Sequence, residues 1–237
     1  MARIRIFAGP NGSGKSTLFS QLQREFNLGH YLNADDLLQQ LQETLLLDLT
    51  NYNVFATQKE WESFWQKHGL KNRALLLTYS NITNNILVFN KKPESYEMAI
   101  LTDFLRHLLL RTAQTFSFET VFSHSSKLDL MHKAVKSGYR CYLYFVATSS
   151  ADIGTQRIHQ RVSQGGHDVP EDKTKERYFR ALNNLLPAMR IAYRSYIFDN
   201  SNNMELIAET TPEQNMLIRS NRIPIWFNKY VLEKLTT

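Results

Sequence analysis

The chain has 237 residues, 43% of them hydrophobic and 21% charged, which is ordinary for a soluble globular protein. This length suits one sizeable domain or one domain with an insertion. The longest apolar stretches fall short of the roughly 20 residues that cross a bilayer, so we expect no membrane contact. The 28 basic and 22 acidic residues give a net charge of +6. They are scattered outside an arginine-rich segment at 157–194, and we do not expect nucleic acid as a partner.

The chain has a single cysteine, Cys141, in an apolar run at 139–147. A disulfide within the chain is therefore excluded, and we interpret the residue as a small buried hydrophobe. The N-terminus leads directly into a predicted strand without a signal peptide. Together these observations predict a cytoplasmic protein.

The chain alternates between strand-like and helix-like segments. Strands are predicted over 3–8, 30–33, 115–120, 139–147 and 195–199. Helices are predicted over 15–26, 35–47, 95–112, 127–137 and 151–164, with a further helix starting near 168. Such alternation indicates an α/β fold with a mainly parallel central sheet.

Two regions lie outside this alternation. Residues 48–93 are interpreted as an insertion after the second strand, in which Trp61 and Trp65 are spaced for packing on one helix. Residues 202–237 are expected to add an edge strand at 204–209 and a C-terminal helix at 224–235. We expect a single domain over 1–237 that carries both additions.

A glycine-rich loop between the first strand and the first helix organises the chain. It fits the pattern G-x-x-x-x-G-K-[ST], and it consists of Gly9, Pro10, Asn11, Gly12, Ser13, Gly14, Lys15 and Ser16, closed by Thr17. Its backbone N–H groups can wrap a polyphosphate at the helix N-terminus. Lys15 is expected to reach the β- and γ-phosphates, and Ser16 to ligate Mg²⁺. The strand before and the helix after disfavour a chance glycine-rich turn, so the sequence predicts a site for ATP or GTP.

Polar side chains follow the second and third predicted strands. In an open parallel sheet the ligand lies beyond the carboxyl ends of the strands, so we expect Asn33, Asp35, Glu119 and Thr120 to contact an acceptor. Asp35 is the candidate base that takes the proton of an acceptor hydroxyl, with helix capping or a favourable first-turn charge as the alternative. Asp36, one residue on, points elsewhere. Glu119 orients the acceptor or holds metal-bound water, with a structural role as the alternative.

Two pairs of arginines flank the turn Gly165-Gly166-His167. Arg157 and Arg161 share one helical face, and Arg177 and Arg180 share a face of the next helix. A helical hairpin edged with guanidinium groups fits a lid that closes over a transferring phosphate. The alternative is a basic pair of helices that faces water.

Several segments, in order along the chain, together resemble the zeta toxin family of P-loop kinases. They are Ala8–Thr17, Tyr31–Asp35, Phe116–Thr120, Gly138–Arg140, Arg161–Val162 with Gln164–Pro170, Arg177–Tyr178 and Tyr196–Ser201. The P-loop alone is unspecific, but its combination with Gly-Gly-His-Asp-Val-Pro and the late Phe-Asp-Asn-Ser is specific. The resemblance implies a three-layer P-loop kinase fold with a helical lid.

The resemblance also implies an activity. Such a kinase uses ATP or GTP with Mg²⁺ to phosphorylate the 3′-hydroxyl of the amino sugar in UDP-N-acetylglucosamine, and many members are toxins neutralised by a small helical antitoxin. By motif position, Lys15 and Ser16 match the phosphate and metal residues, and Asp35 matches the acceptor base. Glu119 and Thr120 match a substrate-site acid and hydroxyl. Arg161 and Arg177 match the transition-state arginines.

The sequence departs from the family pattern in two places. Val121 stands where many members have a second Thr or Ser, and residues 48–93 exceed the expected short helical link, so the acceptor pocket can differ. Two other interpretations stay open: a kinase of another hydroxyl, such as a nucleotide, a sugar or a polynucleotide end, and a nucleotide-dependent regulatory or binding ATPase.

Overall fold

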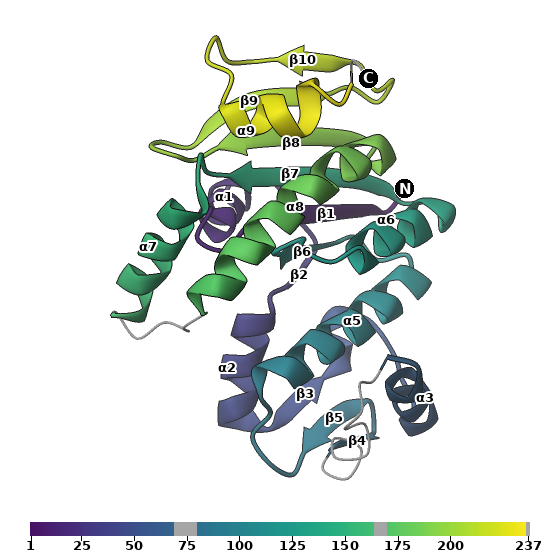
Figure 1. Ribbon diagram of the computed structural model, residues 1–237. Helices are drawn as coiled ribbons and strands as arrows, with labels where there is room; N and C mark the ends of the chain where they lie inside the picture. The colour runs from purple at the N-terminus through teal and green to yellow at the C-terminus, as the bar shows by residue number, and fades with distance from the viewer. Residues whose placement is uncertain (69–79, 164–169, 236–237) are drawn as a thin grey trace. The chain divides into compact units, whose positions relative to one another are not determined.

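The structure is a computed structural model that describes residues 1–68, 80–163 and 170–235 (Figure 1). It divides into two compact units. The first comprises Met1–Leu28 and Ser117–Thr237, and the second comprises Gly29–Phe116. The insertion expected over 48–93 lies within the second unit, which already begins at Gly29.

A central sheet forms the first unit. Its strands are β1 (Arg3–Ala8), β6 (Phe116–Thr120), β7 (Arg140–Ala147), β8 (Arg194–Asp199), β9 (Glu205–Thr210) and β10 (Met216–Ile218), in the order β10-β9-β8-β7-β1-β6. β1, β7 and β8 pair in parallel, whereas β9 and β10 pair antiparallel. The predicted α/β P-loop fold with a mainly parallel sheet is confirmed.

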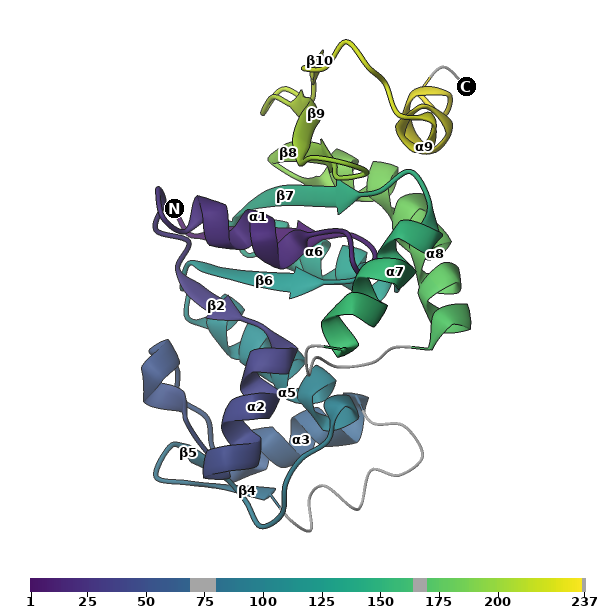
Figure 2. The ribbon, with the colours of Figure 1, turned by 90° about the vertical axis from the view of Figure 1, so that its left-hand side faces the viewer.

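Helices cover both faces of this sheet (Figure 2). They are α1 (Lys15–Leu22), α6 (Ser126–Lys136), α7 (Ala151–Val162), α8 (Glu171–Ile191) and α9 (Ile225–Phe227), the last continued by a π-helical turn over Asn228–Leu232. On one face Phe19 of α1 meets Phe7 edge to face at 5.2 Å. On the other face α6 and α8 pack on β7. The first unit therefore has the expected three layers.

The alternating sequence of β7 explains how it joins these layers. Cys141, Leu143 and Phe145 are fully buried, and Cys141 contacts α6 through Met131. Tyr144 points to the opposite face, where it stacks between Phe7 and Tyr196 with ring centroids 5.0 Å apart on each side. Burial raises the pKa of Tyr144 to about 12. β7 thus supplies core to both sides of the sheet, as expected of a central strand.

The second unit combines helices with a small sheet. Its elements are β2 (His30–Leu32), α2 (Ala34–Thr44), β3 (Leu46–Asp48), a 3₁₀ turn (Leu49–Tyr52), α3 (Gln58–His68), β4 (Ser80–Thr83), β5 (Ile86–Phe89) and α5 (Ser95–Arg111). The strands β3, β5 and β4 form an antiparallel sheet. Trp61 packs edge to face on Trp65 and on Phe104 of α5. The two tryptophans therefore serve packing, as their spacing predicted.

The observed elements differ from the predicted ones mainly at short segments. The expected C-terminal helix over 224–235 is a single α-helical turn followed by the π-helical turn. β3, β4, β5 and β10 were not predicted, because three or four residues are too few to show a period of two. Among the described residues, no helix is long and apolar enough to span a bilayer.

Candidate nucleotide-binding site

The glycine-rich loop joins β1 to α1 at the end of the sheet. Gly9, Gly12 and Gly14 have φ angles of 142°, 70° and 102°, values that L side chains rarely adopt. Gly14 is the N-cap residue of α1, and its carbonyl accepts the first helical hydrogen bond from Leu18 N–H at 3.1 Å. The loop therefore ends at a helix N-terminus, where the first backbone N–H groups have no partner within the helix, and this arrangement binds phosphate.

Neighbouring backbone atoms leave no room for a side chain at Gly9 or Gly12. Gly9 donates its N–H to Thr120 O at 3.2 Å, and a Cβ on Gly9 would lie 2.0 Å from Val146 O. A Cβ on Gly12 would lie 2.4 Å from Gly154 O in α7. The loop is thus packed directly against the ends of β6 and β7 and against α7.

Two of the predicted phosphate and metal residues lie together at the start of α1. Lys15 Nζ donates to Pro10 O at 2.9 Å, so the side chain folds back over the loop. Ser16 Oγ donates to Glu119 Oε2 at 2.9 Å. Ser16 and Glu119 together offer the oxygen ligands that Mg²⁺ prefers.

This donor set fits a magnesium ion that arrives with a nucleotide. Among the described residues, there is no group of three or more His, Cys, Asp or Glu side chains that could hold a metal by itself. Mg²⁺ is usually held by one or two protein oxygens together with substrate phosphates and water. The residues present therefore suit Mg²⁺ that is carried by a bound nucleotide.

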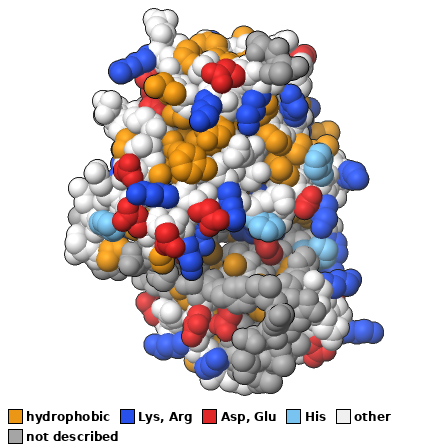
Figure 3. Space-filling model, viewed as in Figure 1, with side chains coloured by type: hydrophobic (Ala, Val, Ile, Leu, Met, Phe, Trp, Pro, Cys, Tyr) orange, Lys and Arg blue, Asp and Glu red, His pale blue; other side chains and the backbone are white. Residues whose placement is uncertain are grey.

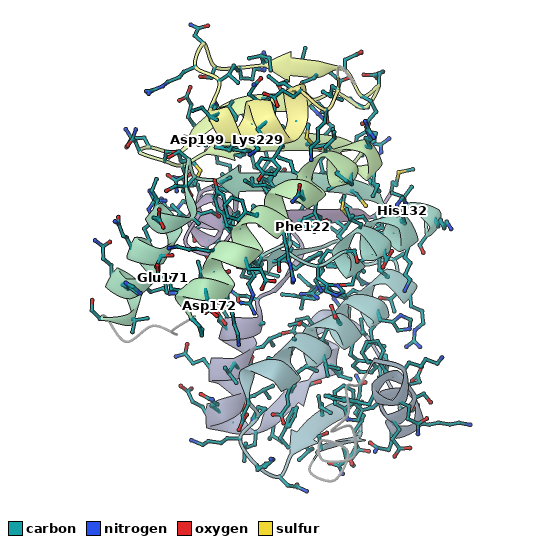
Figure 4. The ribbon with its side chains drawn as sticks, viewed as in Figure 1. Phe122, His132, Glu171, Asp172, Asp199 and Lys229 are labelled. Atoms are coloured by element: carbon teal, nitrogen blue, oxygen red, sulfur yellow. The ribbon has the colours of Figure 1, made fainter. Side chains whose placement is uncertain are left out.

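The turn after Glu119 is held in a fixed conformation. Thr120 Oγ1 accepts a hydrogen bond from Phe122 N–H at 3.2 Å, and Phe122 has a positive φ of 62°. Asn184 of α8 donates to Phe122 O at 2.9 Å, and the Phe122 ring is buried (Figure 4). Glu119 and Thr120 therefore sit on a braced strand end.

The arginines of α7 differ in their contact with the loop. Arg157 Nη1 donates to Gly12 O at 3.3 Å, one helical turn beyond Gly154. Arg161 is exposed in the last turn of α7. The structure thus brings Arg157, which was not among the expected transition-state residues, directly onto the loop.

The arginines of α8 lie beside a buried anchor. Tyr178 is 4% exposed, and its hydroxyl donates to Thr148 O, just past β7, at 2.6 Å. Burial raises the pKa of this hydroxyl. Arg177 is half-buried, and within the described part of the chain its side chain forms no hydrogen bond or ion pair. Arg180 is paired with Glu176 on the surface.

The predicted lid is described through its two flanking helices, α7 and α8. The turn Gly165-Gly166-His167 and the residues Asp168 and Val169 lie outside the described residues. The flanking helices α7 and α8 pack together, and Lys175 of α8 lies 3.3 Å from Asp152 of α7. The first turn of α8 carries Glu171 and Asp172 (Figure 4), and Lys173 follows them directly.

The remaining predicted acceptor residues, Asn33 and Asp35, lie in the second unit. Asn33 is the N-cap of α2, and its Oδ1 accepts from Asp35 N–H at 3.0 Å. Asn33 Nδ2 donates to the Tyr31 hydroxyl at 3.2 Å. Because the side chain of Asn33 caps α2, the exposed carboxylate of Asp35 is not needed as a helix cap. Their roles toward an acceptor stay predictions.

A family model described as an AAA domain, AAA_33, matches residues 4–184. The chain belongs to this family. A curated relative from Haemophilus influenzae, named only as an uncharacterized protein, is 31% identical over 74 residues. This match covers 31% of the present chain and 53% of the relative.

Solved structures share the fold of this AAA domain. The AvrRxo1-ORF1:AvrRxo1-ORF2 complex with sulphate ions matches all of the chain at 11% identity with a TM-score of 0.56, and the chain spans 64% of that protein. The same complex with ATP gives a TM-score of 0.54 at 12% identity, again over all of this chain and 64% of that one. The PezAT toxin–antitoxin system of Streptococcus pneumoniae matches 98% of the chain and 78% of its own at 13% identity, with a TM-score of 0.50. These similarities support a P-loop kinase-like fold.

Residues past the AAA match complete the surroundings of the loop. Asn200, which follows β8, donates through Nδ2 to Ser13 O at 2.8 Å. Sequence reasoning listed Asn200 only as part of a family motif and gave Gly154 no role. The signals were present but weak: an asparagine after a strand in an α/β fold, and a glycine in the interior of a helix.

Proposed function

We propose that this AAA domain chain is a kinase that transfers a phosphoryl group from ATP or GTP to a hydroxyl of a small molecule. The hydrogen bond between Ser16 and Glu119 carries the proposal. It links the predicted metal ligand of the loop to an acid at the end of β6, the strand beside β1 in the sheet. P-loop ATPases also place an acid beside the metal-ligating Ser or Thr, so this contact supports Mg-nucleotide chemistry, and the kinase-like fold favours transfer to an acceptor over hydrolysis. The arginine-bearing helices α7 and α8, beside the loop, supply further charge.

The chain's own side chains would act mainly by positioning and charge neutralisation, which is what phosphoryl transfer needs. Lys15 would leave Pro10 O and bind the terminal phosphates. Arg161 and Arg177 would meet the transferring phosphoryl group from the two helices of the hairpin. Bound Mg²⁺ would supply Lewis acidity at Ser16.

For the acceptor we propose UDP-N-acetylglucosamine, phosphorylated at the 3′-hydroxyl of its amino sugar. The support is the resemblance to zeta toxins together with the fold shared with the PezAT system. Asp35 would take the hydroxyl proton, with Asn33, Glu119 and Thr120 contacting the sugar. A small antitoxin-type protein is the partner that this proposal includes.

The test is to incubate the protein with Mg-ATP and UDP-N-acetylglucosamine and to detect one added phosphate by mass spectrometry. We expect a phosphorylated nucleotide sugar with the wild type and none with Asp35→Asn, whereas Asp35→Asn still binds nucleotide. Asp36→Asn is the matched control, since it removes the neighbouring charge in the same helical turn, and it should retain transfer. ATP turnover that leaves the sugar unchanged would refute the proposed acceptor. Equal loss of transfer and of nucleotide binding in Asp35→Asn would refute its role as base.

A further inference from the structure

The loop that follows β8 contacts the glycine-rich loop through one side chain. Asn200 N–H donates to Ala147 O at 2.7 Å, which fixes the residue to the end of β7. From there Asn200 Nδ2 donates to Ser13 O at 2.8 Å. A Cβ on Gly14 would lie only 2.4 Å from the same nitrogen. The amide of Asn200 is thus in direct contact with the Ser13–Gly14 peptide.

This contact fixes the orientation of that peptide group. The peptide bond is planar and trans, so the Ser13 carbonyl and the Gly14 N–H point in opposite directions. Because the carbonyl faces Asn200, the N–H faces away from it. Backbone N–H groups at this part of the loop are the donors that a phosphate would need. An oxygen in place of Nδ2 would repel the Ser13 carbonyl and remove the constraint.

Asn200 is itself braced from the C-terminal segment. The neighbouring Asp199 accepts from Trp226 Nε1 at 2.7 Å and from Ser201 Oγ at 3.0 Å, both through Oδ1. Ser201 Oγ in turn accepts from Ser149 N–H at 2.8 Å. Trp226 is 4% exposed, and Figure 4 places Asp199 beside the helix that carries it.

We propose that Asn200 is a positioning residue that presets the nucleotide-binding loop, and that Asp199 and Trp226 hold it in place. The inference rests on the proposed function for its ligand, Mg-ATP. It assigns a role to the segment beyond residue 184, where the AAA match ends. The last part of the chain then contributes to nucleotide affinity without contacting the nucleotide.

The test compares Asn200→Ala and Asn200→Asp with Asn202→Asp, an exposed asparagine of the same loop. We expect the Kd for Mg-ATP, measured by calorimetry, to rise about tenfold in Asn200→Ala, the effect of losing one hydrogen bond. It should rise further in Asn200→Asp and stay within about twofold of wild type in Asn202→Asp.

In turnover, the KM for ATP should rise while the KM for the acceptor stays unchanged. General unfolding would not separate the two constants in this way. Trp226→Phe, which keeps a smaller aromatic ring and loses the N–H donor, should also raise the Kd.

Hydrogen exchange of the loop amides provides a readout that does not need the nucleotide. We expect residues 9–17 to exchange faster in Asn200→Ala than in wild type or in Asn202→Asp. Wild-type affinity in both Asn200 variants, or unchanged exchange in Asn200→Ala, would overturn the inference. A wild type that binds no nucleotide would refute the proposed function. Faster exchange in Asn200→Ala would still support the inference that Asn200 positions the loop.

Discussion

Gly154 allows a decisive test of how the glycine-rich loop is held, because two general effects predict opposite signs for Gly154→Ala. Gly154 lies inside α7, where alanine normally stabilises a helix by about 1 kcal/mol relative to glycine. A Cβ at this position, however, would lie 2.5 Å from Asn11 O of the loop. The contacting atom is backbone and cannot rotate away.

The magnitude follows from the space that is missing. Ordinary van der Waals contact begins near 3.4 Å, so the helix and the loop must separate by roughly 0.9 Å, at a cost of about 1–3 kcal/mol for overpacking. After the gain in helix propensity, we expect the free energy of unfolding to fall by roughly 1 kcal/mol. A displacement of about 1 Å in a catalytic loop can lower the rate of transfer by up to about a hundredfold. The rate of transfer should therefore fall by a larger factor than the modest loss in the free energy of unfolding would suggest.

The assay measures urea unfolding, nucleotide Kd and the transfer rate for Gly154→Ala and for Gly138→Ala. Gly138 has a φ of 81°, and an added Cβ would meet nothing within 4 Å, so alanine there costs about 1–2 kcal/mol through backbone strain alone. The two variants should lose similar stability, but only Gly154→Ala should lose nucleotide binding and transfer. If both variants bind nucleotide like the wild type, the close contact between Gly154 and Asn11 does not hold the loop in place.

Three further predictions concern single side chains. Lys15→Ala should lower the transfer rate at least about a hundredfold while unfolding in urea changes little; a large fall in stability would indicate a structural role instead. Asp103→Asn should lower the free energy of unfolding by about 1–3 kcal/mol, because it removes the ion pair of the buried Arg106, and a neutral outcome in urea unfolding would contradict this. Burial lowers the pKa of His30 below 6.5, so the neutral form is favoured in the fold, and stability should fall as the pH drops from 6.5 toward the folded-state pKa. His30→Gln should remove this slope from stability measured against pH, and an unchanged slope would exclude His30 as its source.

The glycine-rich loop and the sheet that carries it were predictable because their determinants are local. Gly9 and Gly14 stand where the loop pattern requires glycine, and both have positive φ angles, while the apolar run at 139–147 predicted the buried strand β7. The expectation that Glu119 lies at the same edge of the sheet as the glycine-rich loop needed only the rule that ligands bind at the carboxyl ends of parallel strands. Local patterning and one topological rule were sufficient for these features.

The contacts that hold the loop could not be derived in the same way. Gly154 meets Asn11, and Asn200 meets Ser13, across long stretches of sequence, and no periodicity encodes such pairs. The arginine pair at 157 and 161 was visible, but which member would contact the loop depends on how α7 is rotated against it. The short strands of the second unit have too few apolar positions for a pattern, so pairing with neighbours decides them.

The charge distribution also needed the structure. On the face of the first unit seen in Figure 3, acidic and basic side chains are interspersed, although the composition gives a net charge of +6. Some charges also pair away from the surface: the buried Glu209 lies 2.8 Å from Arg194. Composition alone could not show how these charges pair.

The buried cysteine of β7 has a practical consequence for studying motion in this protein. Cys141 is fully buried, and burial raises its pKa to about 12, so at neutral pH the sulfur is a shielded thiol and not a reactive thiolate. Because it is the chain's only cysteine, a second cysteine introduced at the exposed Ser163, at the end of α7, would take a maleimide dye alone. The native sequence is in effect a cysteine-free background, in which the movement of a single helix can be followed by fluorescence while substrates bind.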